Sequence, residues 1–402
     1  MAMFDFDAVI DRSASDSIKW KKYQGHDIIP MWVADLDFKS PPAVIDALRK
    51  RVEHGVFGYT RPQDTLNEVV IDHLYRTYDW RVSPSWIVWL PGLVCGLNVC
   101  CRSLGRPHDT IVTHIPAYPP FLSAPKLSQR RLHTFEMQNL QESWHFDLDA
   151  FRHDLPANAA AYILCNPHNP TGRVLRRSEL TQLAQACLER RMVIVSDEIH
   201  CGLVLLPDCR HIPLASIDPE IAGHSITLMS ASKTFNTPGL NCAFAIIPND
   251  SLRRRFNNTM QGIVPHVNVM GLAATQAAFE HGAAWLKALI EYLRANRDLL
   301  QQHVDQTPGL HLTPVEATYL AWIDVRELGL TDAVAFFEFA GLGLMDGRDF
   351  GVPGFVRLNF GCRRALLQEA LNRMTCAVAK IDPKPSESAP LGLTRASDHG
   401  KN

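Results

Sequence analysis

The side chains best suited to chemistry in this 402-residue chain follow three short apolar runs. Asn169 follows the first run, Asp197 and His200 follow the second, and Lys233 follows the third. Together they would place an amide, a carboxylate, an imidazole and an ammonium group at one edge of a sheet. Such a set could bind a small ligand and move a proton on it.

Each of these residues also has an ordinary structural interpretation. Asp197 could cap the next helix, His200 could be a hydrogen-bonded core histidine, and Lys233 could be a solvated surface lysine. The stretch 169–172 could be only a turn. Their joint order and spacing favour a common site.

The elements that must position these residues are short strands that alternate with helices. Apolar runs of strand length occur at 161–165, 192–196, 226–231 and 242–247. Helical segments lie between the first two runs, and Ser178 is the expected cap of the second segment. This alternation predicts an α/β fold with a parallel sheet covered on both faces, in which ligands bind beyond the carboxyl ends of the strands.

Two further helical segments are predicted outside these strands. Residues 40–55 begin with Ser40 as the N-cap and end at Gly55. The stretch 268–304 has few helix breakers after Gly282 and could link a large sheet domain to a smaller one.

The chain is long enough for two domains. Strands at 319–325 and 355–360 are assigned to the smaller, C-terminal domain. The predicted division is an N-terminal segment 1–50 that packs with the small domain, a large domain 51–285, a small domain 286–381 and a disordered tail 382–402.

The composition excludes several classes of function. Apolar residues make up 46% and charged residues 20% of the chain, which is typical of a globular protein. The net charge of −2 offers no basic field for nucleic acid, so a small neutral or zwitterionic partner is expected. No signal peptide, no apolar run long enough to span a membrane and no zinc spacing among the ten cysteines is recognised. Free thiols, no metal and a cytoplasmic location are therefore expected.

Over roughly residues 5–380 the chain resembles the fold-type I pyridoxal 5'-phosphate (PLP) enzymes of the class I/II aminotransferase superfamily. The motifs that carry this resemblance, in order, are NPHNPTG at 166–172, SDEIH at 196–200, SASK at 230–233 and VRLN at 356–359. A closer resemblance, to the MalY/PatB-type carbon–sulfur β-lyases such as cystathionine β-lyase, rests also on residues 31–38, 58–60 and 316–320. It implies a large domain with a mostly parallel sheet covered by helices and a smaller α+β domain.

The resemblance implies that PLP is the cofactor and assigns residues around its ring. Lys233 would hold PLP covalently and then take the Cα proton of the substrate. Asp197 would pair with the pyridine nitrogen, which makes the ring a better electron sink. His200 and Asn169 would face the phenolic oxygen, and Tyr118 would stack on the ring as a further catalytic residue.

The resemblance also implies a phosphate site that includes the backbone N–H groups of Leu93 and Val94 at a helix N-terminus. Ser230 and Ser232 would complete it within the same chain. Tyr59 would reach the phosphate and the active site of a partner subunit, so a homodimer is expected. The alternative for Tyr59 is a buried loop aromatic.

For the substrate, the resemblance implies an amino acid whose α-carboxylate is gripped by Arg357. Ala34 would add a backbone N–H group to that site, and Asn169 would also contact the substrate. A bidentate guanidinium suits a carboxylate. The alternative for Arg357 is an ordinary ion pair within a strand.

Three departures from the family pattern concern the phosphate, the substrate entrance and a late strand. Asn241 stands where many aminotransferases carry an arginine that supports the phosphate, and the β-lyase relatives tend to lack that arginine too. Residues 64–68 replace frequent aromatic residues, which leaves the side-chain preference open. Residues 362–364 replace a family proline.

The resulting functional expectation is α,β-elimination from an S-substituted L-cysteine such as L-cystathionine, which yields a thiol, pyruvate and ammonia. The first alternative is an aminotransferase of an aromatic or acidic amino acid. The second is a regulatory partner without catalysis. The sequence leaves open the thiol side chain and the pathway, methionine biosynthesis among the candidates.

Overall fold

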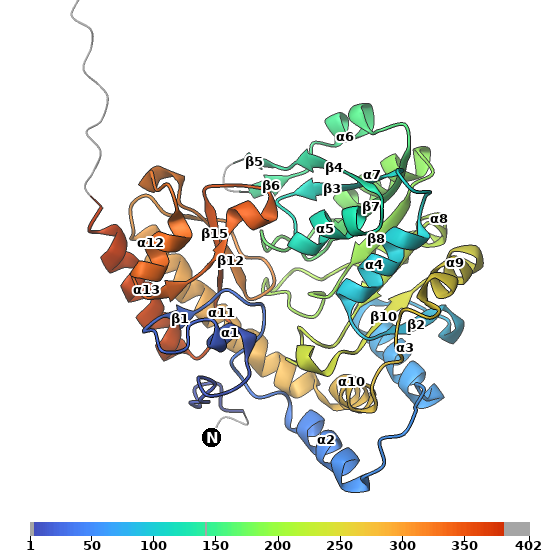
Figure 1. Ribbon diagram of the computed structural model, residues 1–402, viewed down its shortest axis with the longest axis horizontal. Coiled ribbons are helices and arrows are strands. Elements are labelled where there is room, and N and C mark those ends of the chain that lie inside the picture. Colours follow the sequence, from blue (N-terminus) through green and yellow to red (C-terminus); the bar gives the residue numbers. More distant parts are fainter. Residues whose placement is uncertain (1–3, 141–142, 382–402) are drawn as a thin grey trace, which may run out of the picture.

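The computed structural model describes residues 4–140 and 143–381, so the tail predicted over 382–402 lies outside the described residues. Its largest element is a seven-stranded sheet with the order β2-β10-β9-β8-β7-β3-β4 (Figure 1). The strands are β2 (Ile87–Leu90), β3 (Thr110–Ile115), β4 (Arg131–Glu136), β7 (Ala159–Cys165), β8 (Val193–Asp197), β9 (Ser225–Met229) and β10 (Ala243–Ile246). All neighbours pair in parallel except β10, which is antiparallel to both β2 and β9. The predicted α/β fold with a mostly parallel sheet is confirmed.

Helices cover both faces of this sheet, which explains why its central strands are continuous apolar runs. One face packs against α4 (Leu93–Ser103), α5 (Pro119–Leu127) and α9 (Asp250–Met260). The other packs against α6 (Leu148–Asp154), α7 (Arg177–Glu189) and α8 (Pro219–Gly223). Along β7, Ala161 and Ile163 face the first layer, whereas Tyr162 and Leu164 face the second.

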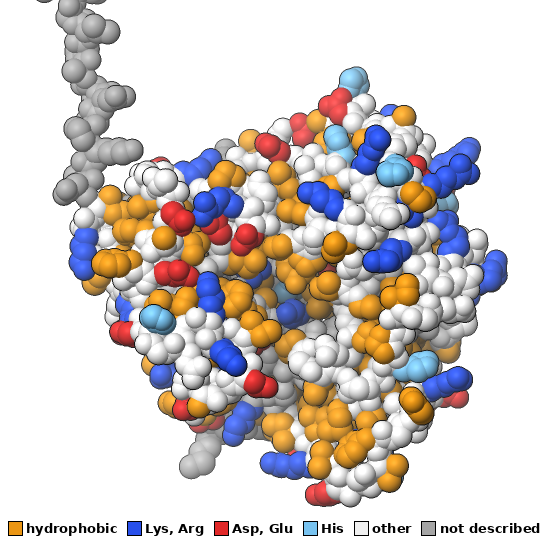
Figure 2. Space-filling view, viewed as in Figure 1, with side chains coloured by type: hydrophobic (Ala, Val, Ile, Leu, Met, Phe, Trp, Pro, Cys, Tyr) orange, Lys and Arg blue, Asp and Glu red, His pale blue; other side chains and the backbone are white. Residues whose placement is uncertain are grey.

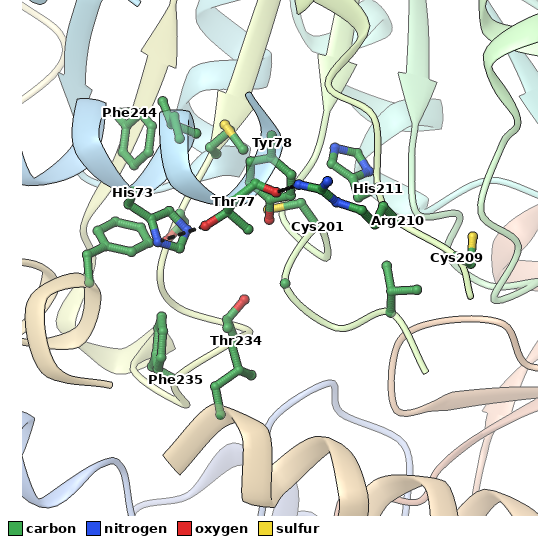
Figure 3. Close-up of a pocket in the computed structure, with 17 residues that line it drawn as sticks. His73, Thr77, Tyr78, Cys201, Cys209, Arg210, His211, Thr234, Phe235 and Phe244 are labelled. Atoms are coloured by element: carbon green, nitrogen blue, oxygen red, sulfur yellow. Dashed lines mark hydrogen bonds between the residues drawn. The ribbon is translucent and has the colours of Figure 1, made fainter. Parts of the chain in front are cut away.

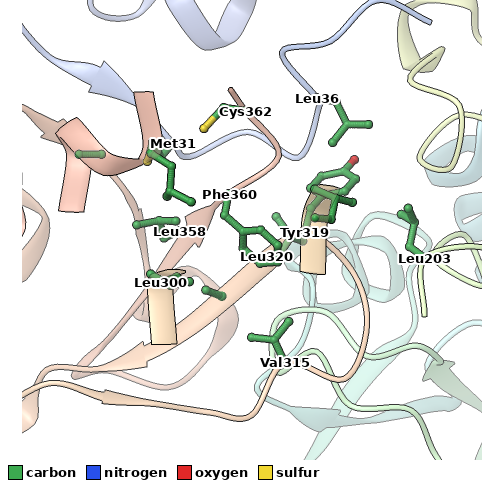
Figure 4. Close-up of a cluster of buried hydrophobic side chains, with 14 of the residues drawn as sticks. Met31, Leu36, Leu203, Leu300, Val315, Tyr319, Leu320, Leu358, Phe360 and Cys362 are labelled. Atoms are coloured by element: carbon green, nitrogen blue, oxygen red, sulfur yellow. The ribbon is translucent and has the colours of Figure 1, made fainter. Parts of the chain in front are cut away.

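A second, four-stranded antiparallel sheet lies in the C-terminal part of the chain, with the order β11-β12-β15-β14. Its strands are β11 (His311–Leu312), β12 (Leu320–Asp324), β14 (Met345–Asp346) and β15 (Phe355–Asn359), accompanied by α12 (Ala333–Phe339) and α13 (Arg364–Val378). The N-terminal segment joins this region because β1 (Ile29–Pro30) pairs with β13 (Leu342–Gly343). Figure 4 shows Met31 and Leu36 of that segment in one cluster with Leu358, Phe360 and Cys362. The domain boundaries at 50, 285 and 381 stay predictions.

The remaining elements connect these parts. They are the helices α1 (Ile18–Lys21), α2 (Pro42–His54), α3 (Asp64–Tyr78), α10 (Val269–His281) and α11 (Ala283–Asp305), the strand pair β5 (Gln138–Leu140) and β6 (Ser143–His145), and the 3₁₀ turns Pro84–Trp86, Leu214–Ser216, Pro238–Leu240, Arg326–Leu328 and Gly347–Phe350. Among the described residues, no helix is both long and apolar enough to cross a bilayer.

Both predicted helix caps are wrong. Pro41 is the N-cap of α2, and the Ser40 hydroxyl instead donates to the carbonyl of Asn236 at 2.9 Å. Ser178 lies inside α7, whose N-cap is Arg176, and the Glu179 carboxylate accepts from the Arg176 N–H group at 2.9 Å. In each case a partner elsewhere in the fold or in the helix determines the start of the helix.

The predicted helical stretch 268–304 is two helices that meet at Gly282. A Cβ atom at this position would lie 2.4 Å from the Ala278 carbonyl oxygen and 2.5 Å from the Phe235 ring. Only glycine therefore allows α10 and α11 to pack this closely against Phe235, two residues after Lys233.

Candidate active site

A cavity of about 330 Å³ lies beyond the carboxyl ends of β7, β8 and β9. It is lined by the predicted site residues Ala34, Leu93, Val94, Tyr118, Asn169, Asp197, His200, Ser230, Ser232 and Lys233. The face of the molecule in Figure 2 is hollowed near its centre, between the parts that carry the two sheets. The topology thus brings together residues from six separate stretches of the chain.

Asp197 ends β8 and is buried in the cavity wall. Its Oδ1 atom accepts a hydrogen bond from the Ile199 N–H group at 3.1 Å. The pKa of the Asp197 carboxyl is raised to about 7, mainly because the group is buried; the Ile199 hydrogen bond and Lys233 oppose this rise, and the charge of Glu198 contributes to it. Such a carboxylate gains stability from a nearby cationic group, as a protonated ring nitrogen would supply.

The Lys233 amine points into the site and is not a solvated surface group. Its Nζ atom donates to the Ala34 carbonyl at 2.6 Å. Burial lowers the pKa of the Lys233 amine to about 8, Arg357 lowers it too, and Asp35 and Asp197 oppose the change. A fraction of the amine is therefore neutral near pH 7, as a nucleophile or a base requires.

His200 is buried against the same cavity and lacks a hydrogen-bond partner on Nδ1 among the described residues. Burial lowers the pKa of its imidazole to about 3, so the ring is neutral. Its ring meets Tyr319 edge-on, with the centroids 6.3 Å apart. A buried ring nitrogen without a partner indicates a place for a ligand atom.

Arg357, in the middle of β15, does not line the cavity itself but reaches it through Asn169. Its Nη1 atom donates to Asn169 Oδ1 at 3.0 Å, and its Nη2 atom donates to the Trp32 carbonyl at 2.8 Å. The Nε atom has no partner, and within the described residues the guanidinium forms no ion pair. The alternative of a strand ion pair is therefore wrong.

Burial lowers the pKa of the Arg357 guanidinium to about 10, so it remains a cation at neutral pH. A buried cation without a counter-ion is costly, and an anionic ligand would offset that cost. Because Asn169 Oδ1 is engaged by Arg357, the NH₂ group of Asn169 is the part available to a ligand.

Another part of the cavity wall is formed by the N-terminus of α4, where Leu93 and Val94 are the first two helical residues. Their N–H groups have no intrahelical acceptor, and the helix dipole favours an anion there. The Ser230 hydroxyl lies nearby but donates to the Cys242 carbonyl at 2.7 Å and accepts from the Ser232 N–H group at 3.0 Å. Donation from Ser230 to a ligand would require this hydroxyl to turn.

The two predicted tyrosines have different surroundings. Tyr118 immediately precedes α5 and lines the cavity, as a residue that stacks on a ring must. Tyr59 lies between α2 and α3, is fully exposed and does not line the cavity. The alternative of a buried loop aromatic is wrong for Tyr59, and its role in a partner subunit stays a prediction.

The backbone carbonyl of Ala34 accepts hydrogen bonds from two side chains of the site. The donors are Lys233 and the Tyr319 hydroxyl, the latter at 3.1 Å, whereas only the N–H group of Ala34 was predicted to act. Asn359 and Asn236 hold the segment around Ala34 through hydrogen bonds to backbone groups of residues 33–38. Tyr319 and Asn359 belong to motifs recognised in the sequence, but nothing in their spacing shows that they hold this loop.

Residues 26–374 match the family described as aminotransferase class I and II, and the chain belongs to this family. Within it, the chain is placed with the PLP-dependent carbon–sulfur lyases of the cystathionine β-lyase type. It is 33% identical to the cystathionine beta-lyase PatB of Bacillus subtilis, over 93% of this chain and 100% of that protein.

Solved structures are similar to this chain over nearly its whole length. The structure of OvoB superposes with a TM-score of 0.92 and 47% identity, covering 94% of this chain and 100% of that one. Cystalysin from Treponema denticola, described as containing a PLP cofactor, superposes with a TM-score of 0.90 and 29% identity over 94% and 100% of the two chains.

The residues present fit PLP, which is the cofactor of this family. The free N–H groups at the start of α4 suit a phosphate dianion, and the buried carboxylate of Asp197 suits a protonated ring nitrogen. The unpartnered Nδ1 atom of His200 and the buried amine of Lys233 complete the wall. The described part of the chain contains no cluster of His, Cys, Asp or Glu arranged to hold a metal ion.

Proposed function

We propose that this protein catalyses α,β-elimination from S-substituted L-cysteines such as L-cystathionine, releasing a thiol, pyruvate and ammonia. The observation that carries the proposal is the placement of an amine of lowered pKa, Lys233, in the cavity wall, with the buried Arg357 behind Asn169 of the same wall and without an ion-pair partner among the described residues. The first is placed to take a Cα proton and the second to bind an α-carboxylate. Relatives named as cystathionine β-lyases support the choice of a sulfur leaving group.

The roles of this chain's residues follow from their contacts. Bound PLP supplies a ring that withdraws electrons from the Cα atom of the amino acid attached to it. Lys233 removes the Cα proton at its Nζ atom, and Asp197 keeps the ring nitrogen protonated. Arg357 and Asn169 orient the substrate through its carboxylate. A thiol with a pKa of ~8.5 then leaves Cβ with little help from an acid.

The proposal includes a homodimer in which Tyr59 completes the partner's phosphate site. The stretch between α2 and α3 exposes Val56, Phe57 and Tyr59, and Val52 of α2 is exposed as well. Figure 2 shows hydrophobic side chains gathered over α2. Burial of this surface against a second copy would give the exposed aromatic side chains a partner.

Product analysis tests the proposal against the aminotransferase alternative. Purified protein saturated with PLP is given L-cystathionine and, separately, S-methyl-L-cysteine, while thiol and pyruvate are measured. We expect equal amounts of the two products from at least one of these substrates. Transfer of the amino group to an added 2-oxo acid without release of thiol would favour the aminotransferase. If no absorbance of protein-bound cofactor remains after PLP is added and the unbound excess is removed, both the lyase and the aminotransferase are contradicted.

A further inference from the structure

A second carboxylate lies directly behind Asp197. Asp197 and Glu198 are neighbours at the end of β8, and neighbouring side chains of a strand point to opposite sides. Asp197 lines the active-site cavity, whereas Glu198 does not. The side chains of Glu198 and its partner His211 are both fully buried.

Hydrogen-bond donors surround the Glu198 carboxylate. Its Oε1 atom accepts from the Ser196 hydroxyl at 2.8 Å and from the Leu214 N–H group at 2.9 Å. Its Oε2 atom lies 2.7 Å from His211 Nε2. Three donors suit the ionised form of Glu198, because a carboxylate only accepts hydrogen bonds.

The contacts of Asn166 determine which nitrogen of His211 carries the proton. Asn166 Oδ1 accepts from the Leu175 N–H group at 3.0 Å, which leaves Asn166 Nδ2 as the donor that faces His211 Nδ1 at 3.5 Å. Nδ1 is then an acceptor, and the proton lies on Nε2, in the hydrogen bond to Glu198. His211 is neutral in this arrangement, so the pair carries the full negative charge of Glu198.

On the other side of His211, the cation Arg210 is exposed to solvent and forms no ion pair with Glu198. Figure 3 shows His211 at the wall of a second cavity, with Tyr78 and Arg210 nearby. The Tyr78 ring meets His211 edge-on with centroids 5.4 Å apart, and Arg210 donates to the Thr77 carbonyl. Within the described residues, the ion-pair contact of Glu198 is with His211 alone.

We propose that Glu198 and His211 are positioning residues whose buried negative charge strengthens the hold of Asp197 on the proton of the PLP ring nitrogen. The inference rests on the role proposed for Asp197. A negative charge one residue away, on a fully buried side chain, favours a protonated ring because electrostatic interactions between buried groups are weakly screened. The same charge is among the causes that raise the pKa of Asp197.

Backbone hydrogen bonds fix the position of Asp197 beside this pair. The Asn166 N–H group donates to the Asp197 carbonyl at 3.0 Å, and the Glu198 N–H group donates to the Leu228 carbonyl at 2.9 Å. The Glu198 side chain in turn connects the end of β8 to the segment that contains Leu214.

The test measures the ring nitrogen directly, in holoenzyme reconstituted with ¹⁵N-labelled PLP. In Glu198→Gln, which keeps the shape but not the charge, we expect the ¹⁵N resonance to move toward that of an unprotonated ring. We also expect exchange of the substrate Cα proton to slow about tenfold, which corresponds to one pKa unit at the ring nitrogen. Glu198→Asp keeps the charge and is expected to restore the resonance.

A matched control replaces another buried imidazole. His114 is buried on β3 and bonds the Tyr162 hydroxyl at 2.8 Å, away from the cavity lining. His114→Gln is expected to lower stability without moving the ring resonance. An unchanged resonance in Glu198→Gln would overturn the proposal.

A measurement on the unmodified protein covers the case in which Glu198→Gln does not fold. In the holoenzyme labelled with ¹⁵N-histidine, His211 is expected to be neutral with its proton on Nε2, and an imidazolium would overturn the proposal. An unprotonated PLP ring in the unmodified protein would instead contradict the role of Asp197 itself. Neither outcome depends on which reaction the protein catalyses.

Discussion

At the scale of single residues, the site is recognisable by buried polar groups that lack partners. Arg357 is a buried cation without a counter-ion, and His200 has a ring nitrogen without a hydrogen bond in the described part of the chain. Folded proteins rarely leave such groups unsatisfied, because each costs free energy. In the proposed function, an anionic substrate is the partner of Arg357 and the cofactor is the partner of His200.

The first prediction concerns the amine. In Lys233→Ala the protein is expected to bind PLP only reversibly and to lose at least ~10³-fold in kcat/KM, since a positioned base contributes this much. Lys287→Ala, at an exposed position of α11, is the matched control and should leave kcat/KM unchanged. Covalent attachment is checked by retention of the cofactor absorbance after gel filtration of reduced, denatured protein. Full activity in Lys233→Ala would contradict the proposed role.

The second prediction concerns the stability of the PLP-free protein. The pKa of Asp197 is raised from 3.8 to about 7, so between these values the folded chain binds more protons than the unfolded chain. The contribution of the Asp197 carboxyl to the free energy of unfolding is therefore fully present below pH 4 and is lost as the pH rises through 7. The free energy of unfolding falls by at most about 1.4 kcal/mol per pH unit over this range.

Urea denaturation of wild type and Asp197→Asn at pH 5 and pH 7.5 checks this. Asparagine does not titrate, so the difference in unfolding free energy between the two proteins should change between these pH values, with wild type losing more as the pH rises. An equal difference at both pH values would show that Asp197 has an ordinary pKa.

At the scale of elements, the start of α4 is the predicted phosphate site. Leu93 is its first residue, a position that tolerates proline. Leu93→Pro removes one N–H donor without breaking the helix and should weaken PLP binding about tenfold or more, the value of one hydrogen bond to a charged group. Arg177→Pro, at the first position of α7 and remote from the cavity, is the control. Fluorescence titration with PLP measures both, and equal affinities would contradict the proposed site.

The strands that position the site could be predicted because they are buried on both faces. β7, β8 and β9 are therefore uninterrupted apolar runs, and the polar residue after each run is conspicuous. The start of α2, the start of α7 and the break at Gly282 depend on Asn236, Glu179 and Phe235. A local sequence pattern does not predict contacts between distant residues. For the same reason it does not predict that the carbonyl of Ala34 accepts a hydrogen bond from Lys233.

At the scale of the whole molecule, the N-terminal segment joins the two sheets at the cavity. Asn359 of β15 bonds the carbonyls of Val33 and Asp35, the latter at 2.7 Å. Asn236, three residues after Lys233, bonds the next part of the same segment. Residues 33–38 of the N-terminal segment therefore contact both the stretch that follows Lys233 and the four-stranded sheet that contains β15.

The expected homodimer gives a prediction at this scale. Phe57→Asp places a charge within the exposed apolar stretch and should shift sedimentation velocity toward a monomer, with a loss of PLP affinity because Tyr59 no longer reaches the partner. Phe339→Asp, at an exposed phenylalanine of α12, is the control. A wild-type protein that sediments as a monomer while fully active would contradict the dimer.

The most direct test of the lyase proposal is the number of turnovers that the PLP-bound protein completes on an S-substituted L-cysteine when no 2-oxo acid is added. We predict many molecules of thiol and pyruvate per active site, at a constant initial rate. Release of one equivalent per site of the 2-oxo acid derived from the substrate, without thiol, and further release only when another 2-oxo acid is supplied, would contradict the lyase and identify an aminotransferase.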